Sequence, residues 1–319
     1  MTLPLPDGVT WRRPALTEAD ADAVFRLVAG HNRAIVGFAD YTMPDALEQL
    51  TEPGFDPGAD AWLVHDRSGA LVGFGGCRDE GGDGRVEIEV IAGDDTVAAW
   101  LFAAARARAD EQARAGGHPA ATVELAVYRD DEAQRTRAAA LGFEPVTTFH
   151  RMRIDHDGGV EVPAGPPSVV VRRGPGDDEL RRQAYSVMAT AFADHFGWGS
   201  PTYEQWQDQI DASPVMDWSQ LWVADVDGRA VAMLHAHAGF VPDEGCGYVR
   251  HVGVLPEHHG RGLARLLLRT AFADDAARGR RGALIHVDTN NVTPAHDLYR
   301  GLGMRPVLVV DVWRRPAPT

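Results

Sequence analysis

The sequence matches itself when it is shifted by about 160 residues. Three pairs of segments correspond in the same order: residues 10–13 with 170–173, residues 61–73 with 221–232, and residues 141–143 with 302–304. Three matches in one order indicate a tandem duplication. A chain of 319 residues has room for two domains, each with its own hydrophobic core.

A glycine- and proline-rich segment, DHDGGVEVPAGPP, separates the two copies. We therefore expect a first domain over residues 1–154, a linker over residues 155–167 and a second domain over residues 168–319. Each copy has the order strand, one or two helices, hairpin, long strand, helix, strand, helix, strand. This order predicts, twice, a mixed and twisted α/β sheet with helices on both faces.

Composition excludes several classes of function. The net charge of −15 argues against a nucleic-acid partner, which would require a basic face. No apolar run approaches the length of a membrane span or of a signal-peptide core, so no membrane partner is expected. The only two cysteines, Cys77 and Cys246, cannot form a disulfide framework. These features predict a protein of the cytoplasm.

The segment from Tyr248 to Ala264 changes from a strand to a helix. Valines alternate up to Val254, Pro256 then ends the strand, and leucines from Leu263 recur at three- and four-residue steps. Between the strand and the helix lies the turn HGRGLA. A glycine turn that opens a helix collects unpaired amides at the positive end of the helix dipole. It is suited to a phosphate or pyrophosphate, although a plain strand-turn-helix corner has the same pattern.

Two known phosphate motifs do not fit this turn, because Gly-Lys-Ser/Thr and G-x-G-x-x-G are both absent from it. It resembles the acetyl-CoA signature of the Gcn5-related N-acetyltransferases, Gln/Arg-x-x-Gly-x-Gly/Ala, with His259 at the Gln/Arg position. The resemblance implies that the coenzyme is held by two groups of backbone amides. Those of Val252, Gly253 and Val254 would bind the pantetheine arm, and those of His259, Gly260, Arg261, Gly262, Leu263 and Ala264 the pyrophosphate.

A second motif, NVTPAHDLYRGLGM over residues 291–304, resembles the last motif of the same family, Asn-x-x-Ala-x-x-Leu-Tyr followed by Gly-Phe. The resemblance implies that Tyr299 donates a proton to the coenzyme sulfur as the thioester breaks. It also implies a coenzyme contact for Asn291, although Asn291 lies one residue further from Ala295 than is usual. The alternative is that Tyr299 is a core aromatic on an amphipathic helix.

The residue that accepts the proton of the amine is less defined. Alternation along residues 247–254 places Tyr248, Arg250 and Val252 on one face and His251 on the other. Relatives often carry a base at the position of Tyr248 or Arg250, but neither is a carboxylate. His235 and His237, which share a face of the adjacent strand, and Glu244 are the remaining candidates. Each of these has a structural alternative, a hydrogen-bonded histidine or a solvated turn carboxylate.

We expect the acceptor in a cleft between the two halves, beside His235 and His237. There Asp194 would hold a cationic amine, Trp198 would stack on a ring, and Tyr248 and Arg250 would contact the acceptor. Histidines are frequent in this part of the sequence, but no carboxylate or cysteine completes a ligand set, so no metal is predicted.

The first half lacks the chemical parts of the second. Asp94 and Asp95 stand where the glycine turn is expected and would repel a pyrophosphate, and Ala138 aligns with Tyr299. The first domain is therefore interpreted as a degenerate copy without a coenzyme site.

The resemblance implies an acetyl-CoA-dependent N-acetyltransferase that acts on a small-molecule amine by direct attack in a ternary complex. The tandem layout is similar to that of the mycothiol synthases, which acetylate the cysteinyl amine of a pseudo-disaccharide. Tyr248, however, stands where those enzymes carry a catalytic Glu. A non-catalytic acyl-CoA-binding module is the other alternative. The sequence specifies neither the acceptor nor whether the chain is a monomer or a homodimer.

Overall fold

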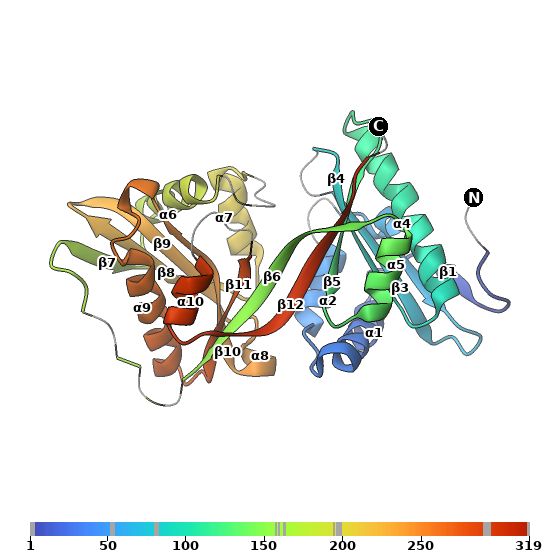
Figure 1. The fold of residues 1–319 in the computed structure, drawn as a ribbon, viewed down its shortest axis with the longest axis horizontal. Coiled ribbons are helices and arrows are strands. Elements are labelled where there is room, and N and C mark those ends of the chain that lie inside the picture. The colour runs from blue at the N-terminus through green and yellow to red at the C-terminus, as the bar shows by residue number, and fades with distance from the viewer. Residues whose placement is uncertain are drawn as a thin grey trace. The chain divides into compact units, whose positions relative to one another are not determined.

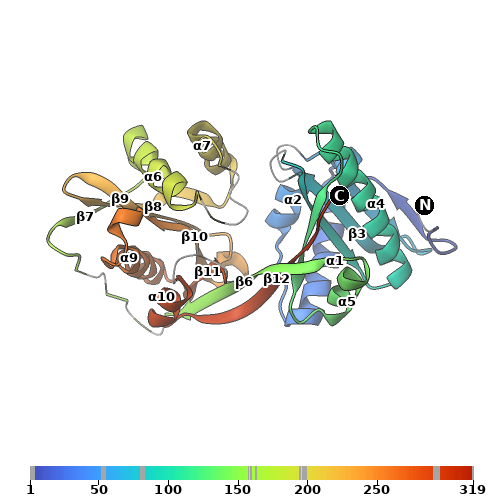
Figure 2. The same ribbon diagram turned by 45° about the horizontal axis from the view of Figure 1, so that its top comes forward.

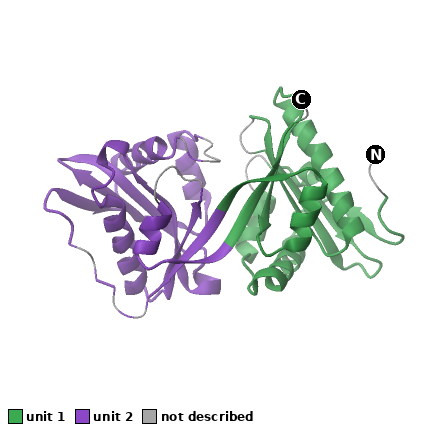
Figure 3. Ribbon diagram, in the orientation of Figure 1, with its two compact units in different colours: residues 1–148, 309–319 green, residues 149–308 purple. Residues whose placement is uncertain are grey.

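The computed structural model describes residues 4–51, 55–79, 83–156, 158, 160–161, 164–193, 195, 200–289 and 295–317. The chain forms two compact units, which are coloured separately in Figure 3. Unit 1 comprises Met1–Thr148 and Val309–Thr319, and unit 2 comprises Phe149–Leu308.

Unit 1 is a mixed sheet with the strand order β1-β2-β3-β4-β5-β12, in which β4 and β5 run parallel. Helix α4 packs against β3 and β4, and α1 also packs against β3 (Figure 1). The strands are β1 (Thr10–Arg12), β2 (Ala61–His65), β3 (Leu71–Asp79), β4 (Arg85–Ala92) and β5 (Thr122–Tyr128), and the helices are α1 (Glu18–Val36), α2 (Met43–Thr51), α3 (Pro57–Asp60), α4 (Asp95–Ala115) and α5 (Glu132–Ala140).

Unit 2 repeats this plan with the strand order β6-β11-β10-β9-β8-β7, in which β10 and β11 run parallel. Figure 2 shows α6 and α7 on one face of its sheet and α9 and α10 on the other. The strands are β7 (Val169–Arg173), β8 (Met216–Val226), β9 (Arg229–His237), β10 (Cys246–Val254) and β11 (Gly282–Asp288), and the helices are α6 (Asp178–Ala191), α7 (Tyr203–Ala212), α8 (Val241–Glu244), a 3₁₀ turn (Pro256–His258), α9 (Leu263–Ala277) and α10 (Ala295–Gly301). The predicted fold class, a mixed α/β sheet built twice, is confirmed.

The two closing strands, β6 (Glu144–Asp155) and β12 (Arg305–Arg315), are exchanged between the copies. Residues Phe149–Asp155 of β6 pair antiparallel with β11 in unit 2, and Val310–Arg315 of β12 pair antiparallel with β5 in unit 1. Both strands therefore change colour along their length in Figure 3. At these strands, the bounds of the compact units differ from the predicted domain boundaries. Two duplicated copies have equivalent sheet edges, so the sequence order alone does not determine which edge a closing strand pairs with.

Local signals account for the ends of the principal helices. The Thr17 side chain accepts a hydrogen bond from the amide of Asp20 and so caps the start of α1. The Asp20 carboxylate pairs with Arg12. Helix α9 ends at Ala277, and Gly279 then adopts φ +74°.

The core of unit 2 lies between its sheet and both helix layers. Val187 and Met188 of α6 and Leu267 and Phe272 of α9 are all less than 3% exposed. Because this core fixes α9 against the sheet, the turn that precedes α9 has a rigid support. Among the described residues, no helix combines the length and the apolar character that crossing a bilayer requires.

Candidate active site

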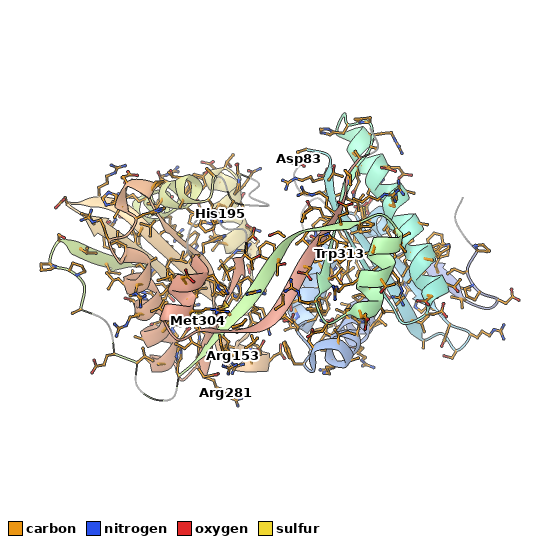
Figure 4. The ribbon with its side chains drawn as sticks, in the orientation of Figure 1. Asp83, Arg153, His195, Arg281, Met304 and Trp313 are labelled. Atoms are coloured by element: carbon orange, nitrogen blue, oxygen red, sulfur yellow. The ribbon has the colours of Figure 1, made fainter. Side chains whose placement is uncertain are left out.

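A cavity of about 590 Å³ opens in unit 2 where β10 and β11 stop pairing. The parallel ladder joins Cys246–Val249 to Gly282–Ile285, and the following residues of both strands line the cavity instead. The turn before α9, the first residues of α9, the helix α10 and residues Phe149, Phe192 and His195 complete the lining. His195 is labelled in Figure 4. The described lining residues all belong to unit 2.

A β-bulge at Arg250 changes the face that β10 presents to the cavity. The antiparallel register with β9 shifts between Val249 and His251, so Arg250 is the extra residue. A bulge interrupts the alternation of side chains. The predicted alternation is therefore wrong beyond this point: His251 lines the same cavity as Arg250 and Val252. Gly253 faces away, since a Cβ there would lie 2.9 Å from that of Ala191 on α6.

The turn before α9 has the geometry of an anion site. Gly260 and Gly262 have φ values of +72° and +77°, which side-chain-bearing residues rarely adopt. Gly262 is the N-cap of α9, no side chain caps the helix, and its first turn contains no acidic residue. The first amides of α9 therefore keep their hydrogen-bonding capacity at the positive end of the helix dipole.

Two histidine side chains form hydrogen bonds that stabilise this turn. Nε2 of His259 lies 3.0 Å from the carbonyl oxygen of Val254, to which it donates, and Nη1 of Arg261 donates to Nδ1 of His258 at 2.8 Å. The turn is thereby attached to the end of β10. The two guanidinium groups that line this part of the cavity, those of Arg261 and Arg265, add positive charge. A phosphate group is the ligand that this arrangement suits best.

Tyr299 lies on α10 and lines the same cavity. Its side chain is buried, yet its hydroxyl makes no hydrogen bond with any described residue. Burial, and secondarily the neighbouring Tyr248, raises the pKa of Tyr299 above the usual range for tyrosine. The phenol therefore keeps its proton at neutral pH and has a free O–H to donate into the cavity.

The structure adds a residue that the sequence did not suggest, His286 on β11. His286 lines the cavity, and its Nδ1 lies 2.8 Å from the hydroxyl of Tyr248. Burial, with a smaller contribution from Arg151, lowers the pKa of His286 to about 3, so the ring is neutral at physiological pH. A histidine within an otherwise buried strand was the available signal. The sequence does not reveal its neighbour across the sheet.

The predicted proton acceptors His235 and His237 lie in the core of unit 2 and are not among the described residues that line the cavity. The ring of His235 is fully buried and stacked on Trp218 at 5.6 Å between centroids. Nδ1 of His237 accepts the amide hydrogen of Gly239 at 3.0 Å, so the neutral ring has no lone pair left for an amine proton. We assign both histidines to the core.

The other predicted acceptor contacts have different outcomes. Arg250 is exposed and lines the cavity, whereas Tyr248 lies behind His286. Glu244, the third candidate base, pairs with Arg151 at 2.8 Å and with Arg153 at 3.2 Å, the latter labelled on β6 in Figure 4. Its carboxylate is therefore used in the structure of unit 2. The predicted contacts Asp194, Trp198 and Asn291 lie outside the described residues.

In unit 1, the connection between β4 and α4 takes the place of the turn before α9, and it offers no equivalent anion site. Only residues 93–94 connect β4 to α4, whereas residues 255–262 connect β10 to α9. The Asp94 carboxylate accepts from the amides of Thr96 and Val97 at 2.9 and 3.0 Å, so it occupies the start of its own helix. Asp95 pairs with Arg137.

Ala138 occupies the position in unit 1 that Tyr299 occupies in unit 2, as the alignment of the two copies predicts. Its carbonyl accepts from the amides of Leu141 and Phe143, and the Tyr299 carbonyl accepts from those of Leu302 and Met304. This shared pattern makes Ala138 the structural equivalent of Tyr299, without the hydroxyl. Within the part of the chain that is described, no group of three or more His, Cys, Asp or Glu side chains is arranged to hold a metal ion.

Comparison with known proteins agrees with this geometry. Residues 184–304 match the Acetyltransferase (GNAT) family. A mycothiol acetyltransferase from Cellulomonas flavigena is 30% identical over 213 residues, which are 63% of this chain and 59% of that relative. The match thus spans about three fifths of the relative's length.

Two solved structures share the fold. A GCN5-related N-acetyltransferase from Sphaerobacter thermophilus superposes with a TM-score of 0.80 and 24% identity, over 98% of this chain and 97% of the other. A tandem GNAT protein from the clavulanic acid biosynthesis pathway superposes with a TM-score of 0.73 and 17% identity, over 98% and 99%. Residues 184–304 are therefore similar to the Gcn5-related N-acetyltransferases, and the whole chain has the fold of the tandem structure.

Proposed function

We propose that this protein is an acyltransferase that uses an acyl-CoA, specifically acetyl-CoA, to acetylate the amine of a small molecule. The observation that carries the proposal is that one cavity contains both an uncapped helix start and a free tyrosine hydroxyl. The first feature suits the coenzyme's pyrophosphate and the second suits its sulfur. A cavity of this volume that contains both the helix start and the tyrosine hydroxyl therefore fits the coenzyme.

The residues of the cavity divide into two groups by their chemistry. We assign the pyrophosphate to the amides that start α9, together with Arg261 and Arg265. The edge of β10 beyond the bulge, from Val252 to Val254, is assigned to the pantetheine arm, because its ladder with β11 has ended there. The thioester supplies an activated acetyl group for the acceptor.

The chemical step is a direct transfer in a ternary complex. The amine nitrogen attacks the thioester carbonyl carbon, a C–N bond forms, the C–S bond breaks, and the sulfur leaves with its electron pair. Tyr299 then donates its proton to this sulfur, a role that its raised pKa favours at neutral pH. Bond formation makes the amine nitrogen acidic, so that even a weak base is able to take its proton.

We propose His286 as that base. Its ring lines the cavity, burial keeps it neutral, and the contact with Tyr248 holds its orientation. In the productive tautomer, Nδ1–H donates to the oxygen of Tyr248 and Nε2 accepts the amine proton.

Mycothiol synthase is a narrower candidate within the same function. It is supported by the relatives named mycothiol acetyltransferase, at 30% identity for the one from Cellulomonas flavigena. Tyr248, together with His286, would then replace the Glu base that the resemblance to mycothiol synthases implies at the position of Tyr248. A non-catalytic acyl-CoA-binding module has less support, because it has no use for the free hydroxyl of Tyr299.

The test is turnover of acetyl-CoA with a panel of amines that includes cysteinyl-glucosaminyl-inositol, with release of free thiol as the measurement. We expect thiol release that depends on one class of amine and is lost in Tyr299→Phe. Saturable acetyl-CoA binding without thiol release for every amine would favour the binding module. Turnover with amines other than the cysteinyl compound would exclude mycothiol synthase as its specific role.

A further inference from the structure

Unit 1 contains a second cavity, of about 300 Å³, that differs in character from the coenzyme cavity. It is lined by residues of α1, α2, β3, β4, β5, α5 and β12 and by the loop residues Asp40, Tyr41, Phe55 and Asp131, all within unit 1. This volume is at the lower end of the range for small-molecule sites.

The cavity exists because β4 and β5 separate. Their parallel ladder joins only Arg85–Glu87 to Thr122–Glu124. Beyond these pairs Glu89 and Ile91 of β4 line the cavity, as do residues 126–128 of β5. The pairing of β4 with β3 continues from Asp79 to Gly73 without a register shift, so Glu87, Glu89 and Ile91 share one face.

Glu89 is the central polar group of this cavity. Its side chain is partly buried, and desolvation raises the pKa of its carboxyl group. Oε2 accepts a hydrogen bond from Gln49, which in turn accepts one from the hydroxyl of Tyr41. Oε1 accepts no hydrogen bond from a described residue, and no described cation forms an ion pair with Glu89. A partly buried carboxylate that lines a cavity, with one oxygen not engaged by a donor, indicates a position for a cationic ligand.

Acidic side chains predominate among the other ionisable residues that line the cavity. Asp131 pairs with His31 at 3.0 Å, and Asp40 accepts from the hydroxyl of Tyr128 at 2.8 Å. The guanidinium of Arg78 also lines the cavity and lies 3.7 Å from Glu87. Both Arg78 and His31 partly offset the effect of desolvation on the pKa of Glu89. Carboxylates therefore outnumber basic groups around the cavity.

The other walls suit an organic cation. Val28, Phe55 and Ile91 provide apolar surface, and the tyrosines provide aromatic rings, which attract cations. A polyanionic coenzyme is unsuited to this site, both by charge and because Asp94 occupies the amides at the start of α4.

We propose that unit 1 has a binding site for a small organic ammonium ion, whose charged group donates to Oε1 of Glu89 within this cavity. The site is separate from the coenzyme cavity in both residues and charge. It gives the degenerate copy a ligand of its own, an amine rather than a nucleotide. The proposal does not depend on acetyl transfer in unit 2.

The test compares phenethylammonium chloride with 2-phenylethanol, a neutral molecule of similar shape. Binding to the full-length protein is measured by calorimetry, and the site is located by nuclear Overhauser contacts from the ligand ring to Tyr41 or Phe55. Wild type should bind the ammonium ion saturably and 2-phenylethanol at least about tenfold more weakly. Glu89→Gln should weaken ammonium binding about ten- to a hundredfold, the loss expected for one charge-assisted hydrogen bond.

Two control variants separate this site from others. Glu144→Gln makes the same change in charge at an exposed position of unit 1 and should leave binding unchanged. Tyr299→Phe should also leave it unchanged, because Tyr299 belongs to the cavity of unit 2. Equal affinity in wild type and Glu89→Gln, or the absence of saturable ammonium binding to wild type, would overturn the proposal. Either result would leave acetyl-CoA turnover untouched, so it would not bear on the proposed function.

Discussion

The hydroxyl of Tyr248 lies 2.8 Å from Nδ1 of His286, and this contact links β10 to β11 where His286 lines the cavity of unit 2. Because one nitrogen of the imidazole is held by Tyr248, the ring has a defined orientation. The other nitrogen is left for chemistry in the cavity.

Replacing His286 therefore tests the proposed base. We expect His286→Ala to lower kcat about a hundredfold, within the usual range for loss of a general base, while the Kd for acetyl-CoA stays nearly constant. Tyr248→Phe removes only the orienting contact and should cause a smaller loss. Steady-state kinetics and calorimetry measure the two quantities. Wild-type kcat in His286→Ala would assign the proton to another group.

The turn before α9 offers an internally matched test of coenzyme binding. Gly262 and Gly279 lie at opposite ends of α9, have φ values of +77° and +74°, and have open space where a Cβ would be. Substitution by Asp thus imposes similar backbone strain at both sites, but only Gly262→Asp adds negative charge beside the proposed pyrophosphate. We expect acetyl-CoA affinity to fall at least about tenfold in Gly262→Asp and to stay constant in Gly279→Asp. Equal affinities in the two variants would refute the site.

Tyr299 is expected to act through its proton alone. Tyr299→Phe keeps the ring and removes the hydroxyl, so kcat should fall about a hundredfold or more without a change in acetyl-CoA affinity. A general acid is active below its pKa. Since burial raises the pKa of Tyr299, the wild-type rate should not decline through loss of this proton between pH 7 and about 10. A decline with an apparent pKa below 9 that is absent from Tyr299→Phe would contradict this assignment.

Much of the fold was predictable because its signals are local. The order of strands and principal helices that the sequence predicts for each copy is the order found, because short apolar segments and cap residues such as Thr17 are local signals. The glycine turn and Tyr299 were also predictable, because each belongs to a short motif. Their meeting in one cavity follows from the order of strands and helices.

The rest depends on contacts between distant residues. The bulge at Arg250 places His251 at the cavity. No residue type in β10 predicts that the strand contains an extra residue there. The exchange of β6 and β12 depends on which of two equivalent edges each strand meets. His235 and His237 looked catalytic because polar residues at alternate positions of a strand suggest a site, but Trp218 and the amide of Gly239 provide structural partners for them.

Unit 1 should bind no acetyl-CoA, so the expected stoichiometry is one coenzyme per chain. Asp94 takes up the helix amides, the connection between β4 and α4 is too short for a glycine turn, and Ala138 replaces the tyrosine. Calorimetry with wild type should give a single class of sites that Gly262→Asp removes. Two equivalents bound per chain, or residual tight binding in Gly262→Asp, would show a coenzyme site in unit 1.

The buried histidines of unit 2 should make stability depend on pH. His235 has its pKa lowered by burial to about 4, whereas in the unfolded chain a histidine titrates near 6.5. Between these values the unfolded state binds more protons, so the free energy of unfolding falls as pH decreases from about 6.5 to about 4. For His235 alone the loss amounts to at most about 3 kcal/mol.

His237 and His286, whose pKa values are lowered by burial to about 3, act in the same direction and extend the loss to lower pH. Asp275 acts in the opposite direction, because burial raises its pKa to about 6. The variant His235→Phe keeps an aromatic ring against Trp218 and removes one titrating group, so the other contributions cancel when it is compared with wild type. Urea unfolding at pH 7 and pH 4.5 should show a smaller loss of stability in His235→Phe. An equal loss in both proteins would mean that His235 is already protonated, or accessible to water, in the folded state.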